Sequence, residues 1–120
     1  MLSSSQAALY RRLTLGDDAL IASVFSGSVG GSDSLDHRTS SLVRLAALIA
    51  VDADTPAYQC EVRTAISAGV TSDQITAVLS VVARIAGSAL LMSAAPKLAL
   101  AMGYDVDAGL EDADTRDSGE

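Results

Sequence analysis

The fold is decided by residues 35–51, which read LDHRTSSLVRLAALIAV. The apolar residues that recur there every three or four positions are Leu42, Leu45, Ala46 and Ile49, and Val43, Ala47 and Ala50 widen the stripe. This spacing predicts a helix that is buried on more than half of its circumference. Asp36 stands before the first turn, where a carboxylate can accept a hydrogen bond from a free backbone N–H group, so we expect it to be the N-cap.

A second helix is predicted directly after this one. Residues 52–56 interrupt the apolar pattern, and Pro56 suits the first turn of a helix because that turn does not need its missing N–H group. We expect this helix to run to Ala68 and to end at Gly69, since glycine adopts the left-handed backbone of a helix C-terminus without strain. The two helices therefore predict a tight helical hairpin.

Two further helices complete the predicted domain. Thr71 and Gln74 have the spacing of a capping box, in which each side chain bonds to the backbone N–H group of the other. The helix that follows has one apolar face, made of Ile75, Val78, Leu79, Val82, Ile85 and Ala86. Gly87 permits a break, and a last helical stretch with Pro96 near its middle runs to Gly103.

The regions on either side of this domain differ from it in pattern. Residues 5–15 predict one short helix, and Asp17 can cap a second one that begins after it. Glycines and serines at 26–32 predict a flexible link rather than a phosphate-binding loop, because no strand precedes them. Residues 105–120 hold seven acids against Arg116, which predicts a solvated tail. We divide the chain into an N-terminal arm with its link (1–34), a helical domain (35–104) and an acidic tail (105–120).

The composition favours an all-α bundle and excludes several classes of function. The 120 residues are 49% hydrophobic but only 3% aromatic, so the core is built from Leu, Ile, Val and Ala. The net charge of −7 and the scattered cations argue against binding to nucleic acid. Cys60 is the only cysteine, which rules out an intrachain disulfide and fits a reducing, cytoplasmic location. We expect no metal and no cofactor.

Two further patterns bear on the membrane and on secretion. Residues 75–92 approach the length of a membrane span, but Arg84 near their middle would be costly in lipid, so we expect a buried protein helix and no membrane partner. In residues 1–15 the two arginines follow the apolar residues instead of preceding them, which is not the order of a signal peptide.

Three segments carry a resemblance to a known family. They are LDHRT at 35–39 with the apolar residues up to 50, VRTAISAGVT at 62–71, and the apolar helix at 75–87. In these segments, a little under half of the chain, the sequence resembles the carboxymuconolactone decarboxylase family, the all-helical group that also contains the alkylhydroperoxidase-D-like proteins. The resemblance implies a homo-oligomer, usually a trimer or a hexamer, in which hairpins of neighbouring subunits pack together.

The resemblance also implies where a site would lie. Family members with peroxidase activity have two cysteines, a histidine and an acid at positions that fall here near Asp54, Ala57, Glu61 and Ser41, and all four differ from the pattern. A dithiol cycle needs two thiols within bonding reach, so with Cys60 alone we expect no thiol peroxidase activity. The decarboxylase branch does not require the cysteines, but it also places a histidine where Glu61 stands.

Glu61 and Arg84 are the candidate catalytic residues. We expect Glu61 in the first turn of its predicted helix, where the helix dipole favours the ionised form, so it would act as a base. Arg84 lies in a mostly apolar helix and needs a carboxylate or water beside it. If it meets Glu61, the pair is either structural or a receptor for a carboxylated substrate. The alternative is that Arg84 lies on a face of small residues and pairs across a subunit interface.

Arg44, Tyr58 and Cys60 are the candidate substrate-binding residues. Arg44 either lines an interface or pocket, or covers apolar surface with its stem while its charge reaches water. Tyr58 lines the mouth of the hairpin or fills the core. We expect Cys60 to be buried and unreactive, since no nearby histidine activates its thiol; redox sensing would require it to be exposed. His37, in the first turn of its helix, is expected to be a neutral surface residue.

Two functions fit these residues. The first is a decarboxylase-like lyase or isomerase that acts on a small carboxylated substrate without a cofactor, with Glu61 moving the proton and Arg84 or Arg44 holding the carboxylate. The second is a non-catalytic, oligomeric binding or scaffold member of the same family. Catalysis predicts that Glu61 and Arg84 face one cavity reached by solvent, whereas loss of catalysis predicts a filled apolar interior there.

Overall fold

All regular structure in the described part of the chain is helical. The computed structural model describes residues 1–27 and 34–118. The elements in these residues are all helices, which confirms the predicted all-α class. The chain divides into two compact units, Met1–Leu35 and Asp36–Glu120. Most of the predicted flexible link falls on residues 28–33, which lie outside the described residues.

The first unit contains two short helices, α1 (Ser4–Thr14) and α2 (Asp18–Phe25). The Asp17 side chain caps α2 by accepting a hydrogen bond from the backbone of Leu20, and it also pairs with Arg12 at 2.9 Å. Among the described residues of this unit, Leu20 is the one buried side chain. The unit therefore has almost no core of its own.

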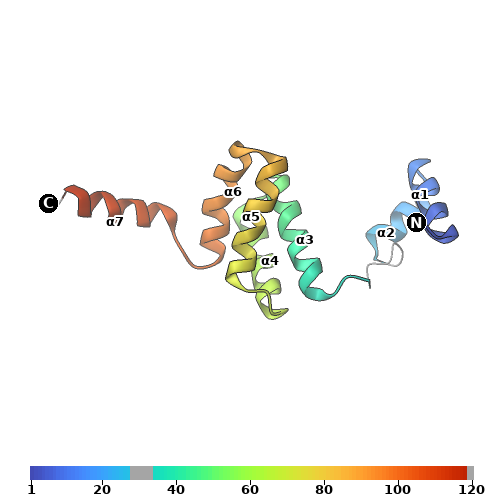
Figure 1. The fold of residues 1–120 in the computed structure, drawn as a ribbon, viewed down its shortest axis with the longest axis horizontal. Coiled ribbons are helices and arrows are strands. Elements are labelled where there is room, and N and C mark those ends of the chain that lie inside the picture. Colours follow the sequence, from blue (N-terminus) through green and yellow to red (C-terminus); the bar gives the residue numbers. More distant parts are fainter. Residues whose placement is uncertain (28–33, 119–120) are drawn as a thin grey trace. The chain divides into compact units, whose positions relative to one another are not determined.

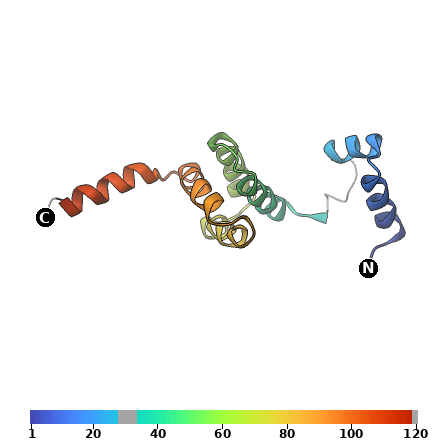
Figure 2. The ribbon, with the colours of Figure 1, turned by 90° about the horizontal axis from the view of Figure 1, so that it is seen from above.

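The second unit contains the bundle that carries the candidate site. Its helices are α3 (His37–Ala50), α4 (Thr55–Ser67), α5 (Ser72–Ala86) and α6 (Ser88–Ala101). They lie side by side in Figure 1, and Figure 2 shows them from above. α3 packs against α4 and α5, and α6 packs against the same two helices. The predicted hairpin of α3 and α4 thus forms one side of a four-helix bundle.

The predicted helix ends are present in the bundle. Asp36 caps α3 by accepting from the backbone N–H group of Thr39 at 2.7 Å. Thr71 and Gln74 form the capping box of α5, with both hydrogen bonds in place. Gly87, at φ +86° and ψ 172°, is the sole residue between α5 and α6, so this glycine makes the whole turn between the two helices.

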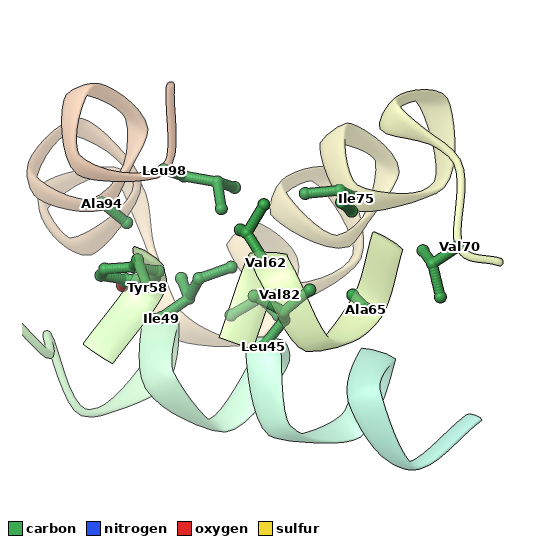
Figure 3. Close-up of a cluster of buried hydrophobic side chains, with 10 residues drawn as sticks. All are labelled: Leu45, Ile49, Tyr58, Val62, Ala65, Val70, Ile75, Val82, Ala94 and Leu98. Carbon is green, nitrogen blue, oxygen red and sulfur yellow. The ribbon is translucent and has the colours of Figure 1, made fainter. Parts of the chain in front are cut away.

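The core lies between the four helices and is aliphatic except for one tyrosine. Figure 3 shows the buried side chains, from all four helices and from the turn before α5, spread along the length of the bundle. The buried members of this core are Leu45, Ile49, Tyr58, Val62, Ala65, Val70, Ile75, Val82, Ala94 and Leu98. In the figure Tyr58 lies beside Ile49 and Ala94, so its ring fills the end of the core near the turn between α3 and α4.

The acidic C-terminal segment contains a helix that the sequence did not predict. α7 spans Val106–Ser118. Asp105 accepts a hydrogen bond from the backbone N–H group of Ala108, and Asp107 stands in the first turn, where negative charge is favourable. The high charge density suggested a solvated tail, and the helix is compatible with it, because the acidic side chains of α7 up to Asp114 are exposed.

Candidate functional site

An ion pair joins the two helices of the predicted hairpin. The Nε group of Arg44 on α3 donates a hydrogen bond to Oε1 of Glu61 on α4 at 2.8 Å. The Nη2 group of the same arginine donates to Oγ of Ser41 at 3.3 Å. Ser41, Arg44 and Glu61 therefore form one hydrogen-bonded group, and two of its members stand at positions where the family resemblance places site residues.

This group spans the boundary between the core and the solvent. Ser41 is fully buried, the Glu61 side chain is 14% exposed, and the Arg44 side chain is 50% exposed. Ser41 and Arg44 are three residues apart on α3, so they share the side of that helix that faces α4. The Arg44 guanidinium thus bonds to the buried Ser41 hydroxyl and to the Glu61 carboxylate, and the rest of it is exposed to water.

Two expectations for Glu61 are wrong: its place in the first turn of its helix and its pairing with Arg84. Glu61 lies in the middle of α4 and not in its first turn, so the partial charge at the helix N-terminus does not reach it. Its ion pair is formed with Arg44, whereas Arg84 is exposed in the last turn of α5. The structure therefore brings together Glu61 and Arg44 out of the predicted set, and it does not pair Glu61 with Arg84.

Tyr58, three residues before Glu61 in the sequence, belongs to the core. Its side chain is fully buried, and its hydroxyl group has no hydrogen-bond partner among the protein atoms described. Burial raises the pKa of the Tyr58 hydroxyl, and the negative charge of Asp52 raises the pKa further. Of the two interpretations left open by the sequence, the structure supports a residue that fills the core.

Cys60 is exposed, which corrects the expectation of a buried thiol. The reason lies in the register of α4, because Tyr58, Val62 and Ala65 point to the core at intervals of four and three residues. Cys60 falls between two of these positions and therefore lies on the opposite side of the helix. His37 is exposed at the start of α3, as expected.

A second polar cluster was missed by the sequence analysis. At the turn between α3 and α4, Asp52 accepts hydrogen bonds from Ser93 Oγ at 2.7 Å and from Lys97 Nζ at 3.2 Å. Lys97, the only lysine in the sequence, also donates to the carbonyl oxygen of Ala53 at 3.1 Å. These bonds, led by the one from Ser93, lower the pKa of the Asp52 carboxyl group. The cluster fastens α6 to the turn.

In the sequence, this cluster was marked by a possible turn residue, Asp52, and not by a motif. Asp52 has φ +54°, a left-handed conformation that aspartate tolerates better than most residues. A polar residue directly after an apolar helix was therefore a candidate for a turn residue, but its partners lie more than forty positions away.

Two other kinds of site are absent from residues 1–27 and 34–118. No group of three or more histidine, cysteine, aspartate or glutamate side chains is arranged there to hold a metal ion. No helix in these residues has both the length and the apolar composition needed to cross a membrane.

The sequence was also compared with known proteins. The model of the carboxymuconolactone decarboxylase family matches residues 18–100, which include α2, α3, α4, α5 and all of α6 except its last residue. Comparison with curated proteins and with solved structures gives no match.

Proposed function

The chain belongs to the carboxymuconolactone decarboxylase family, and from this premise we propose that it is a cofactor-free lyase or isomerase acting on a small carboxylated substrate. The observation that carries the proposal is the 2.8 Å ion pair between Arg44 and Glu61. This pair combines a group that binds carboxylates with a group that accepts and returns protons, at the boundary between core and solvent.

Binding of the substrate begins at Arg44. Its half-exposed guanidinium has more donors than Glu61 and Ser41 use, so a substrate carboxylate can approach it from the solvent. The incoming carboxylate competes with Glu61 for the guanidinium. This exchange releases the Glu61 carboxylate from the guanidinium, so that it can take a proton from the substrate.

Proton transfer then occurs at Glu61. In an isomerisation, the free carboxylate removes a proton from one carbon of the substrate and returns it to another, so that the enzyme ends unchanged. The anion formed in between is stabilised by Arg44, whose charge is fixed in place through its bond to the buried Ser41. In a decarboxylation, Glu61 takes a proton from water and gives it to the carbanion left when carbon dioxide departs, so that it ends as the carboxylate that pairs with Arg44.

The experiment is turnover of γ-carboxymuconolactone, followed by its ultraviolet absorbance. We expect Glu61→Gln, which keeps the shape but cannot accept a proton, to lower kcat by about 100-fold or more. Arg44→Lys removes the planar fork and should mainly raise KM. The matched control is Arg63→Lys, an exposed arginine on α4, which should behave like the wild type. Equal turnover by wild type and Glu61→Gln would refute the role of Glu61.

A non-catalytic, oligomeric binding or scaffold protein is the second candidate. Two observations favour it: Arg84 is absent from the Glu61 site, and the interior beside that site is filled by Tyr58 and its aliphatic neighbours. On this proposal the Arg44–Glu61 pair only fastens α3 to α4. Absence of turnover by the wild type, together with retained binding of small carboxylates measured by calorimetry, would select this candidate.

A further inference from the structure

One face of the bundle, formed by α3 and α5, is apolar and exposed. Val43 on α3 is 54% exposed, and Val81 and Ile85 on α5 are 66% and 91% exposed. Two adjoining grooves run between the helices along this face. The residues that line the first groove are Leu42, Val43, Ala46, Ala77, Val78 and Val81, with Gln74 at its end. The second groove continues from Ala46 and Val81 towards Ala50 and Ile85.

Large and small residues alternate along this face. On α5, Ala77 and Val81 are one helical turn apart on the same face. The small Ala77 side chain leaves a depression, and the larger Val81 side chain next to it forms a ridge. If two copies of α5 meet in opposite directions, with a twofold axis near Leu79, the Val81 of each copy lies opposite the partner's Ala77. The same surface then supplies both the ridge and the groove, which is the requirement for a twofold contact between identical chains.

Charged residues at the two ends of the stripe have the same symmetry. Asp73 stands in the first turn of α5 and Arg84 in its last turn, eleven positions apart on the face that holds Ala77 and Val81. Neither residue forms an ion pair within the described part of the chain. In the antiparallel arrangement each Arg84 comes opposite the partner's Asp73, so the contact is complementary in charge as well as in shape.

From these observations we infer that the α3–α5 face is a twofold interface with a second copy of this chain. Val81 enters the groove lined by the partner's Leu42 and the partner's Ala77, and Arg84 pairs with the partner's Asp73. The inference identifies a surface for the self-association that the second candidate function assumes and rests on that part of it. It explains why an arginine follows an apolar stripe that would otherwise remain open to water.

The first test measures the association of the full chain by sedimentation equilibrium. We expect the wild type to form dimers, or larger assemblies that contain this dimer. Val81→Glu places a charge in the groove and should weaken association by about 100-fold or more, because the charge loses its water without gaining a partner. Gln59→Glu is the control, an exposed residue on α4 outside both grooves, and should leave association within about threefold of the wild type.

The second test exchanges the charges and does not depend on apolar packing. Arg84→Asp or Asp73→Arg alone places like charges opposite each other and should weaken association by about tenfold. The two changes together restore opposite charges and should recover most of the wild-type affinity. Helix content, measured by circular dichroism at a concentration where the variants are monomeric, shows whether each variant remains folded.

The outcomes separate failure of the interface from failure of self-association. A wild type that stays monomeric at all concentrations would overturn both the inference and the oligomeric part of the second candidate. An oligomer that is insensitive to Val81→Glu would overturn this interface alone. An oligomer that Val81→Glu weakens, but whose two charge reversals do not compensate each other, would overturn the antiparallel register.

Discussion

Tyr58, Cys60 and Glu61 are neighbours on α4 but lie in three different environments. The tyrosine is fully buried, the cysteine is exposed, and the glutamate is mostly covered and paired with Arg44. Each residue's surroundings follow from the angle at which it leaves the helix. The sequence predicted that these residues matter together, but their sorting depends on which side of α4 meets α3 and α6.

The Arg44–Glu61 contact illustrates the part of the site that sequence alone could not supply. Both residues were singled out from the sequence, yet the predicted partner of Glu61 was Arg84. The residues of the observed pair are seventeen positions apart, on different helices. Which arginine reaches the carboxylate is decided by the register of α3 against α4, and residue type carries no information about that register.

The buried hydroxyl of Tyr58 leads to a prediction about stability. Because this hydroxyl group is buried without a protein partner, removing it relieves a desolvation cost and leaves the packed ring in place. Tyr58→Phe should raise the free energy of unfolding by about 1 kcal/mol, measured by urea denaturation. Tyr104→Phe, in an exposed tyrosine, is the control and should change nothing. A loss of stability in Tyr58→Phe would show that the hydroxyl has a partner.

Asp52 leads to a prediction about pH. Its pKa is lowered in the folded chain by Ser93 and Lys97, whereas in the unfolded chain it lies near the ordinary value of about 3.9. A lowered carboxyl pKa stabilises the fold above the unfolded value, and that stability is lost as the pH falls through the folded value. Asp52→Asn, which keeps the left-handed backbone, should therefore lower Tm at pH 7, and the difference from the wild type should shrink below pH 4.

The control for this pH dependence is Asp54→Asn. Asp54 is exposed at the start of α4, and its side chain forms no capping hydrogen bond. Its effect on Tm should be small at every pH. If the Tm difference between Asp52→Asn and the wild type stayed constant from pH 7 to pH 2, the Asp52 carboxylate would not be the titrating group.

At the scale of the helices, local signals were sufficient for most of the bundle. Asp17, Asp36 and the pair Thr71 and Gln74 were predicted as caps, and all of them form the expected hydrogen bonds. These signals act within four residues of chain, so a sequence contains them completely. α7 was missed because its residues lack an apolar stripe, and an acid-rich composition is as typical of a solvated tail as of a helix.

Gly87 provides the prediction at this scale. The backbone of this residue, at φ +86° and ψ 172°, is one that only glycine adopts without strain, while a Cβ atom there would meet nothing within 4 Å. The cost of Gly87→Ala is therefore backbone strain alone, and we expect it to lower the free energy of unfolding by about 1–3 kcal/mol in urea. Ser88→Ala, one residue later in α6, is the control. Equal stability of the two variants would contradict this account of the turn.

At the scale of the whole molecule, the two units differ in how much they bury. Met1–Leu35 buries Leu20 among its described residues, whereas the second unit contains the continuous core of α3 to α6. Short helices without a core are marginally stable in water. Membership of the family, which the match over residues 18–100 establishes, therefore says more about the bundle than about α1.

This difference predicts the pattern of hydrogen exchange. The backbone amides of α1 and α2 should exchange within seconds at neutral pH, while amides at the centres of α3, α4, α5 and α6 should be protected for minutes or longer. Mass spectrometry of peptides from each helix measures this directly. Protection of α2 equal to that of α3 would show that the first unit gains stability from a contact beyond its own residues.

The chain has no tryptophan and three tyrosines, and their distribution makes the molecule its own optical reporter. Tyr10 lies on α1, Tyr58 in the core of the bundle, and Tyr104 between α6 and α7. Only Tyr58 among them is buried, so the change in tyrosine emission on unfolding follows the bundle and not the helices before or after it. Total helicity also includes the helices outside the bundle, whereas the change in tyrosine emission reports the bundle alone. The two signals should therefore change at different denaturant concentrations.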